Sequence, residues 1–544
     1  MNVFLLYPDR EWLNPDYYID YKNITTDLTL NSMFSLASQK VIYQNNTVKR
    51  IESPDPYIKD TMYRVVLTPL KSSEEIYYRQ SIIEDAIRNE EFIEAVYTLT
   101  GKTLMNWDKL GRHVINKGST DQTGKLVTRI HTIKLFSDSL SVLKSFIIAK
   151  RGNFKSQGLQ GFCKRFLESY SDEKENLIKD ILSRISFYVS TDDTVYKKPT
   201  VEKPCFAMSC KVGDGCKLID FKLTDLETSL QKYRNPDSTI SKLKEYITSL
   251  SQDSFSTDNS IETSRQAAML ETAVIKYVLS FFEPFMDEFE PFWDRLHFQI
   301  AFYRGAAILT HHVKRFGLNY CYPKVCDRKR LSFAELKEFV MCIEQKVDAV
   351  GNTCEIDPKM LIIITGANQG GKSTFLRSIG IAQVMLQCGL FVIADRFESG
   401  LFSSLFMHFT RREDETMNSG RLDEELNRMN GIVNNLGPDS LILLNESFAT
   451  TTEKDGSVIA YDIIKALNEA GVKIITVTHL LSFAQKMYEE NKALEASGKP
   501  SDVTFFCAER KENGERTYKM IQNIPSLTSF GLDLYEQIIE GESE

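Results

Sequence analysis

One segment restricts the fold of this 544-residue chain more than any other: an apolar run that passes through a glycine-rich turn into a helical pattern. It reads KMLIIITGANQGGKST, from Lys359 to Thr374, and contains the spacing G-x-x-x-x-G-K-[ST]. Glycines let backbone N–H groups converge on phosphate oxygens, and the helix that follows adds the positive end of its dipole. The segment therefore predicts a phosphate-binding P-loop between a buried strand and a helix.

The residues of this loop have separate predicted roles in binding ATP and Mg²⁺. Lys372 is expected to reach the β- and γ-phosphates, and Ser373 to hold Mg²⁺ through its hydroxyl. A chance glycine-rich loop is the alternative, but strand, spacing and helix occur together here. The predicted nucleotide-binding residues are Gly366, Asn368, Gly370, Gly371, Lys372, Ser373 and Thr374.

A second apolar run, Leu441 to Leu444, leads directly into Asn445 and Glu446. In P-loop NTPases the end of this strand carries an acid that holds Mg²⁺. Asn445 keeps an oxygen ligand but removes one negative charge, so we expect a weaker metal site. Glu446 can act as the general base for the attacking water. The pattern predicts slow hydrolysis, or ordinary turnover if the amide is a harmless variant.

A third run, KIITVTH, ends at His479. A histidine at this strand end can contact the γ-phosphate or the attacking water, or it can be only a turn residue. We take it as a catalytic candidate together with Glu446. The three runs lack polar alternation and are separated by helical patterns, which predicts a parallel sheet buried on both faces.

The whole chain indicates a multidomain protein. Residues 1–65 form an N-terminal segment of loops and one short helix, and residues 66–335 show helical periodicity. Strand-and-turn patterns near residues 170–265 predict a small β or mixed α/β insertion. Residues 336–544 are the predicted α/β ATPase domain. An aromatic stripe over residues 267–317 favours helix-packing core over a cofactor site.

Composition narrows the compartment and the partners. The net charge of -8 argues against a wholly basic nucleic-acid coat but is compatible with a local basic patch. Ten cysteines without a regular framework suit a reducing compartment. The one close group, Cys205, Cys210 and Cys216, lacks the usual spacing of a zinc site. No signal peptide and no run near ~20 apolar residues are present, so we expect a cytoplasmic protein without a membrane partner.

These motifs resemble those of the MutS family of DNA mismatch-repair ATPases. TGANQGGKST is similar to the family's P-loop, HFTRREDETMNSGRLDEELNRMNGIV to its next motif, and VTHL to its Thr-His pair, in the same order over residues 359–490. A weaker likeness extends upstream, beginning at LTPLKSSEEIYYRQSIIEDAI. The resemblance implies a helical core and lever with a clamp-like insertion, then an ATPase domain of the ABC type with C-terminal helices that form a homodimer.

The resemblance also implies a serine that reaches the γ-phosphate of the other subunit. It would fall at or next to Ser419, for which a helix N-cap is the alternative role. We find no Phe-x-Glu element of the kind that the family inserts at a mismatch. The chain therefore resembles a shortened member that lacks the mismatch-recognition domain.

DNA binding requires clustered positive charge. Two clusters are candidates, one before the insertion, with Phe154 and Phe162 interleaved, and one within it; a solvated helix face is the alternative. The first cluster is Lys144, Lys150, Arg151, Lys155, Lys164 and Arg165, and the second is Lys197, Lys198, Lys203, Lys211 and Lys217.

Together with the resemblance, these patterns predict a homodimeric, ATP-driven clamp on structured or mismatched DNA, active in repair or recombination. The alternative is a nucleotide-gated protein scaffold with slow hydrolysis and no DNA contact, which the acidic net charge would suit. A transporter-type ATPase of the cassette class is disfavoured because the run Leu-Ser-Gly-Gly-Gln is absent.

Overall fold

A computed structural model describes residues 1–12, 14–44, 47–116, 122–183, 186–190, 201–205, 208–213, 217–223, 261–347, 349–356, 358–410, 420–511 and 515–525. The chain divides into two compact units. We call Met1–Phe4, Glu91–Lys155 and Leu159–Ile300 the helical unit, and Leu5–Glu90, Ser156–Gly158 and Ala301–Glu544 the sheet unit. A helical region followed by a mixed α/β domain was predicted and is confirmed. The domain boundaries near residues 65 and 335 stay predictions.

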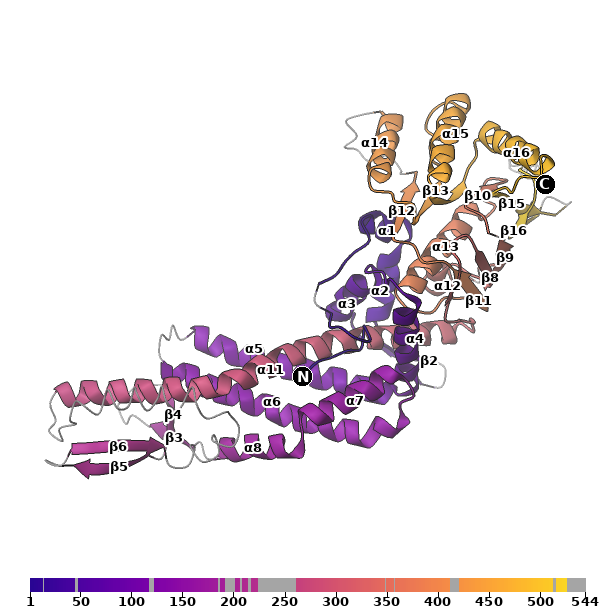
Figure 1. The fold of residues 1–544 in the computed structure, drawn as a ribbon. Helices are drawn as coiled ribbons and strands as arrows, with labels where there is room; N and C mark the ends of the chain where they lie inside the picture. The colour runs from indigo at the N-terminus through magenta and orange to yellow at the C-terminus, as the bar shows by residue number, and fades with distance from the viewer. Residues whose placement is uncertain are drawn as a thin grey trace, which may run out of the picture. The chain divides into compact units, whose positions relative to one another are not determined.

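The sheet unit is built on a six-stranded sheet in the order β12–β13–β14–β10–β15–β16 (Figure 1). All neighbouring strands are parallel except β15 and β16. Every residue of β10 and β14 is buried, which explains why their sequences lack polar alternation. The strands are β10 (Leu361–Thr365), β12 (Ser404–Phe409), β13 (Ser440–Asn445), β14 (Lys473–Val477), β15 (Val503–Arg510) and β16 (Arg516–Gln522).

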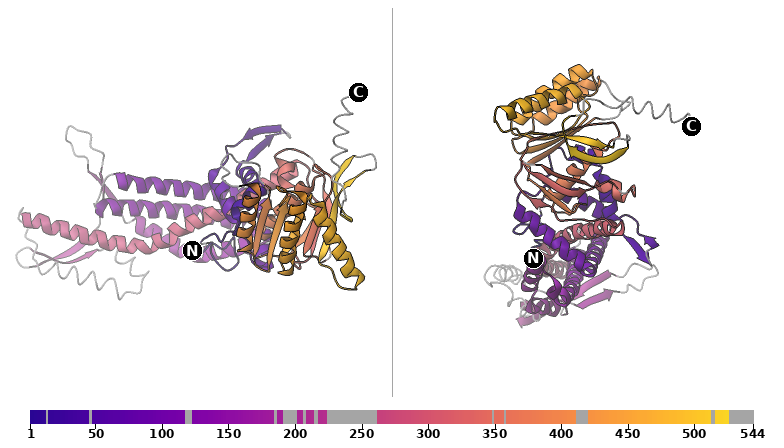
Figure 2. Two further views of the ribbon diagram at one scale, coloured as in Figure 1. Left: turned by 90° about the horizontal axis from the view of Figure 1, so that it is seen from above. Right: turned by 90° about the vertical axis from the view of Figure 1, so that its right-hand side faces the viewer.

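Helices cover both faces of this sheet. On one face α14 (Arg421–Val433), α15 (Glu453–Glu469) and α16 (Leu481–Ala496) share a hydrophobic core with Ile442 and Leu444, and they form one layer in the right-hand view of Figure 2. The other face carries α13 (Lys372–Gln387), whose Gly380 lies against Leu443. Because β10, β13 and β14 are parallel neighbours, their carboxyl ends share one edge of the sheet, where α/β proteins bind ligands.

A second sheet of the same unit has four strands in the order β7–β11–β8–β9. The strands are β7 (Lys324–Val325), β8 (Leu331–Leu336), β9 (Asn352–Ile356) and β11 (Arg396–Ser399). The short helix α12 (Phe339–Ile343) lies between β8 and β9, and β9 precedes β10 directly in the chain.

The N-terminal part of the sheet unit contains more regular structure than its sequence indicates. It comprises α1 (Tyr21–Asp27), α2 (Leu30–Ser38), a hairpin of β1 (Val41–Gln44) and β2 (Thr47–Ile51), α3 (Pro56–Val66) and α4 (Ser73–Arg88). The prediction of a single short helix in this segment is therefore wrong. Asp20, just before α1, accepts a hydrogen bond from the Met407 backbone N at 2.9 Å, so the segment covers the edge strand β12.

The helical unit consists of long helices and a small β insertion. Its helices are α5 (Glu90–Asn116), α6 (Gln122–Lys150), the 3₁₀ turn η1 (Arg151–Asn153), α7 (Gln157–Ser169), α8 (Asp172–Ser183) and most of α11 (Ile261–Arg315). Two antiparallel pairs form the described part of the insertion: β3 (Ser186–Ser190) with β4 (Val201–Cys205), and β5 (Met208–Gly213) with β6 (Lys217–Leu223). Phe289, Phe292 and Trp293 of α11 are buried, which confirms the aromatic stripe as core.

The described residues lack a membrane-spanning helix, a cluster of metal ligands and, among the cysteines with described side chains, a disulfide. None of their helices is both long and apolar enough to cross a membrane. They contain no group of three or more His, Cys, Asp or Glu side chains that could hold a metal, and Cys216 lies outside them. The cysteines whose side chains are described, among them Cys163, Cys388 and Cys507, are free thiols.

Candidate nucleotide-binding site

The predicted P-loop lies between β10 and α13, as its spacing requires. Gly366 and Gly371 have φ of 120° and 88°, in the left-handed region that favours glycine. A Cβ at Gly366 would also lie 2.9 Å from the backbone N of Ala508 on β15. The neighbouring strand thus holds the loop in a shape that only glycine permits, with the first helical residue, Lys372, beside it.

Lys372 is buried, at 4% exposure, and its Nζ donates to the carbonyl oxygens of Gly366 and Ala367 at 2.9 and 2.8 Å. Burial lowers the pKa of Lys372 to about 8. A buried ammonium is costly unless it is paired, and two carbonyls neutralise no charge. A phosphate in the loop would supply the missing negative charge, so the loop favours an anion.

The two predicted metal ligands meet at the edge of the sheet. Ser373 Oγ donates a hydrogen bond of 2.8 Å to Asn445 Oδ1, which stands at the end of β13. A hydroxyl and an amide carbonyl are hard oxygen ligands that Mg²⁺ accepts. The pair therefore fits Mg²⁺, but it provides no carboxylate of its own. A bound metal would depend on phosphate oxygens for negative charge.

Glu446 and His479 also lie together. Glu446 Oε1 is 3.0 Å from His479 Nε2. This hydrogen bond is the main reason why the pKa of Glu446 is lowered, against the opposing effect of burial. The carboxylate is consequently ionised near neutral pH and can accept a proton. The predicted catalytic pair is thus assembled across the ends of β13 and β14.

One cavity of about 500 Å³ brings most of the predicted residues together. Its lining includes Gly370, Gly371, Lys372, Ser373, Thr374, Glu446 and His479. Gly366, Asn368 and Asn445 belong to the same loop and strand edge but do not line the cavity, and Asn368 is exposed. Ser419, the predicted serine for the neighbouring subunit, lies outside the described residues, as do the C-terminal residues 526–544.

The opposite wall of the cavity consists of residues that the sequence analysis missed. It is largely apolar and comes from the end of β8, from the segment between β8 and β9 and from β16: Leu336, Met341, Val347, Ala349, Val350 and Tyr518. Asn352 holds Tyr518 in place, since its Oδ1 accepts from the Met520 backbone N at 2.7 Å and its Nδ2 donates to the Tyr518 carbonyl at 3.4 Å. No local motif marks these residues, and Tyr518 lies far from the P-loop in sequence.

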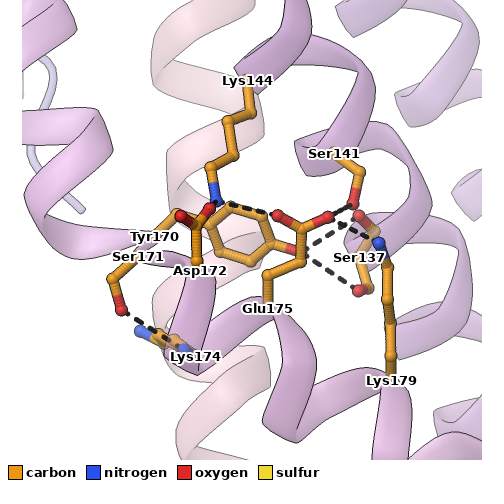
Figure 3. A network of polar contacts seen from close by, with 9 residues as sticks. All are labelled: Ser137, Ser141, Lys144, Tyr170, Ser171, Asp172, Lys174, Glu175 and Lys179. Atoms are coloured by element: carbon orange, nitrogen blue, oxygen red, sulfur yellow. Dashed lines mark hydrogen bonds and ion pairs between the residues drawn. The ribbon is translucent and has the colours of Figure 1, made fainter.

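The first predicted DNA cluster is divided by the fold. Lys144 is nearly buried, and its Nζ contacts Asp172 at 2.5 Å and Glu175 at 2.8 Å, in a polar network between α6 and α8 (Figure 3). Phe154 and Phe162 are buried at 3% and 1% exposure, so stacking on bases by these rings is excluded. The prediction is therefore wrong for these three residues.

The other members of that cluster vary in exposure. Arg165 is half-buried with its guanidinium over the Phe4 ring at 4.8 Å, and Lys150 is paired with Glu91 at 3.2 Å. Arg151, Lys155 and Lys164 are exposed. In the second cluster, Lys203, Lys211 and Lys217 lie on β4, β5 and β6, and Lys197 and Lys198 lie outside the described residues.

Comparison with known proteins agrees with this architecture. Residues 362–538 match the family model described as MutS domain V, and residues 71–316 match the model described as MutS2 N-terminal domain. The first match contains the nucleotide site, and the second contains the helical unit's main helices. Together they cover most of the chain.

Individual relatives are similar over a smaller part. DNA mismatch repair protein MSH3 of Debaryomyces hansenii is 30% identical over 179 residues, 31% of this chain and 17% of that protein. DNA mismatch repair protein MutS of Pseudothermotoga lettingae is 34% identical over 204 residues, 36% and 25% of the two chains. Endonuclease MutS2 of Lacticaseibacillus casei is 28% identical over 178 residues, 32% and 22%. The chain thus spans at most a quarter of the length of these curated relatives.

Proposed function

Because the chain belongs to the MutS family and carries its domain V, which is an ATPase domain, we propose that it is an ATP-driven DNA-binding protein that works as a homodimer. The proposal rests mainly on one cavity that is lined by the buried P-loop lysine Lys372, by Ser373 and by the Glu446–His479 pair. Asn445, at the adjacent end of β13, accepts a hydrogen bond from Ser373. Each of these is suited to one part of Mg·ATP.

In the proposed complex the triphosphate occupies the loop, where it replaces the carbonyl partners of Lys372. Mg²⁺, when bound, neutralises charge on the β- and γ-phosphates, and Ser373 and Asn445 would hold it. The nucleoside extends along the apolar wall. Tyr518, at 47% exposure on the rim of the cavity, offers its ring to the base.

Hydrolysis follows from the position of the Glu446–His479 pair. Glu446 accepts a proton from a water molecule as the oxygen of that water attacks the γ-phosphorus, and ADP leaves with the electrons of the broken P–O bond. His479 holds the carboxylate at 3.0 Å and so fixes its direction. Since Asn445 lacks a charge, we propose that turnover is slow.

We also propose that the chain binds DNA. It is supported by the names of the relatives, two of which are DNA mismatch repair proteins, and by the match to the MutS2 N-terminal domain. Arg151, Lys155 and Lys164 are exposed on the helical unit and are the contacts we propose. The clamp on structured or mismatched DNA and the cytoplasmic location remain part of the same proposal.

The test combines phosphate release with DNA binding by the purified full chain. Fluorescent duplex, mismatched duplex and four-way junction would be titrated at two salt concentrations, with and without Mg·ATP. We expect ATP-responsive binding that weakens steeply with salt, and loss of both activities in Lys372→Ala. ATP hydrolysis without DNA binding at low salt would instead support the protein scaffold, and absence of hydrolysis would refute the ATPase proposal.

A further inference from the structure

The segment Glu446–Thr450, which we call the Glu446 loop, has an unusual backbone. Glu446 and Phe448 have φ of 56° and 65°, in the left-handed region that non-glycine residues rarely occupy. Such conformations persist only where surrounding contacts determine them. The contacts that hold this loop therefore also determine where the Glu446 carboxylate points.

Strand contacts hold the beginning of the loop. The Glu446 backbone N donates to the Val477 carbonyl at 2.8 Å, and Thr410 Oγ donates to the Glu446 carbonyl at 2.8 Å. These bonds fix one peptide on each side of Glu446. They do not reach Phe448, whose left-handed backbone needs a separate partner.

That partner is Glu425 on α14. Its Oε1 accepts from the Phe448 backbone N at 3.2 Å, and its Oε2 accepts from the Thr450 hydroxyl at 2.5 Å. Glu425 is 5% exposed, so its carboxylate is removed from water and directed at the loop. A buried carboxylate with a charge-assisted bond from each oxygen is a strong and directional restraint.

A buried histidine links the same elements. His408 on β12 has Nδ1 2.7 Å from Ser447 Oγ and Nε2 3.2 Å from the Glu425 carbonyl oxygen. Its ring stacks on Phe448, with ring centroids 5.7 Å apart. The loop, β12 and α14 thus form one buried polar cluster. Because every polar group in it is paired, a change at Glu425 is transmitted to the loop.

We propose that Glu425 is a positioning residue for the hydrolysis of ATP: by holding Phe448 and Thr450 it aims the Glu446 carboxylate at the attacking water. The inference rests on the proposed function. Glu425 does not line the nucleotide cavity, so it acts through the loop and not on the substrate. The helix α14 thereby controls the chemical step without touching the nucleotide.

The first test compares Glu425→Ala with the matched control Asp423→Ala, an exposed acid on the same helix. We expect Glu425→Ala to lower kcat about 10- to 100-fold, because small displacements of a catalytic group are costly. The KM for ATP should stay within about threefold, since the P-loop is unchanged. Glu425→Gln keeps an acceptor for Phe448 and should recover most of the loss. An unchanged kcat per nucleotide-binding site in Glu425→Ala would overturn the inference.

Two further variants separate positioning from folding. Thr450→Val removes one of the two contacts with little change in volume and should lower kcat about 3- to 10-fold even if Glu425→Ala folds poorly. In a Glu446→Gln background, Glu425→Ala should change residual turnover less than about twofold, because the group that it aims is already lost. A full additional loss there would show a general structural role and refute the proposal. A wild-type chain that binds ATP without hydrolysing it would instead refute the proposed function.

Discussion

Replacing Lys144 by Met should destabilise the helical unit by about 1–2 kcal/mol at pH 7. Burial opposes ionisation of Glu175, but hydrogen bonds from Lys144, Lys179 and Ser141 outweigh it and lower the pKa of Glu175 from 4.5 to about 2. A shift of that size corresponds to about 3 kcal/mol for all partners together. Three partners share this free energy, and solvent weakens the contribution of Lys179, which is half-exposed. The second contact of Lys144, with Asp172, adds little because Asp172 is 88% exposed. We therefore assign about half of the 3 kcal/mol to the Lys144–Glu175 pair.

The effect of Lys144→Met on stability should depend on pH, because it acts through the ionised form of Glu175. A carboxylate whose pKa is depressed by folding contributes stability that is present above pH 4.5 and lost as the pH falls towards 2. The effect of Lys144→Met should therefore be full at pH 7, still substantial at pH 3, and small only near pH 2, where Glu175 becomes protonated in the folded chain as well. Urea unfolding, monitored by tryptophan fluorescence, is a suitable assay. Two of the three tryptophans, Trp107 and Trp293, lie in the helical unit.

The control is Lys150→Met, whose partner Glu91 is 89% exposed and whose removal should cost less than about 0.5 kcal/mol. A Lys144→Met chain with unchanged stability at pH 7 but weaker DNA binding would refute the reasoning. It would mean that Lys144 leaves the network to contact DNA, as its place in the basic cluster first indicated.

Three further predictions concern the sheet unit. Asn445→Asp should strengthen the apparent Mg²⁺ affinity in ATP hydrolysis about tenfold, measured by Mg²⁺ titration, because it adds a charge beside Ser373. Tyr518→Ala should raise the Kd for ATP about 5- to 20-fold in calorimetry while leaving inorganic phosphate binding unchanged. Burial raises the pKa of Asp20 from 3.8 to about 6, so ionisation of this carboxyl is unfavourable in the folded chain. The free energy of unfolding therefore falls as the pH rises from 3.8 to 6 and stays lower above pH 6. Asp20→Asn keeps an acceptor for the Met407 N–H. It should raise the free energy of unfolding by about 1 kcal/mol at pH 8, seen as a higher melting temperature, and by less at pH 4.

The sequence predicts the centre of the sheet unit well, because burial there leaves a direct trace. The continuous apolar runs at Leu361, Leu441 and Lys473 all belong to central strands. The N-terminal helices leave a weaker trace. Neither α1 nor α2 has a side-chain cap, and Thr29 before α2 has a φ of 54°. Packing of residues such as Phe34 stabilises these helices, and packing partners distant in sequence cannot be read locally.

The candidate site likewise contains residues that sequence patterns predicted and residues that they could not predict. Ser373, Asn445, Glu446 and His479 were brought together by one rule, that parallel strands and the P-loop helix meet at a single sheet edge. Tyr518 could not be found so, because it reaches the cavity from an added antiparallel strand. The prediction for Lys144 in the basic cluster failed for another reason: the density of charge along a helix does not show which way each side chain points, and Lys144 points inward to Glu175.

The amide at position 445 changes the order in which ligands can assemble, beyond the strength of the metal site. The described residues provide no cluster of acidic ligands, and the oxygens of Ser373 and Asn445 are both uncharged, so free Mg²⁺ gains little at this edge before nucleotide arrives. Lys372, whose hydrogen-bond partners are the carbonyls of Gly366 and Ala367, would attract the nucleotide anion first in the proposed cycle. Under the proposed function, Ser373 and Asn445 would therefore receive Mg²⁺ together with ATP and not alone. The same residues bear on product release in the proposed cycle: Ser373 and Asn445 would hold Mg²⁺ without a carboxylate, so after loss of the γ-phosphate we expect ADP to be retained mainly by the P-loop.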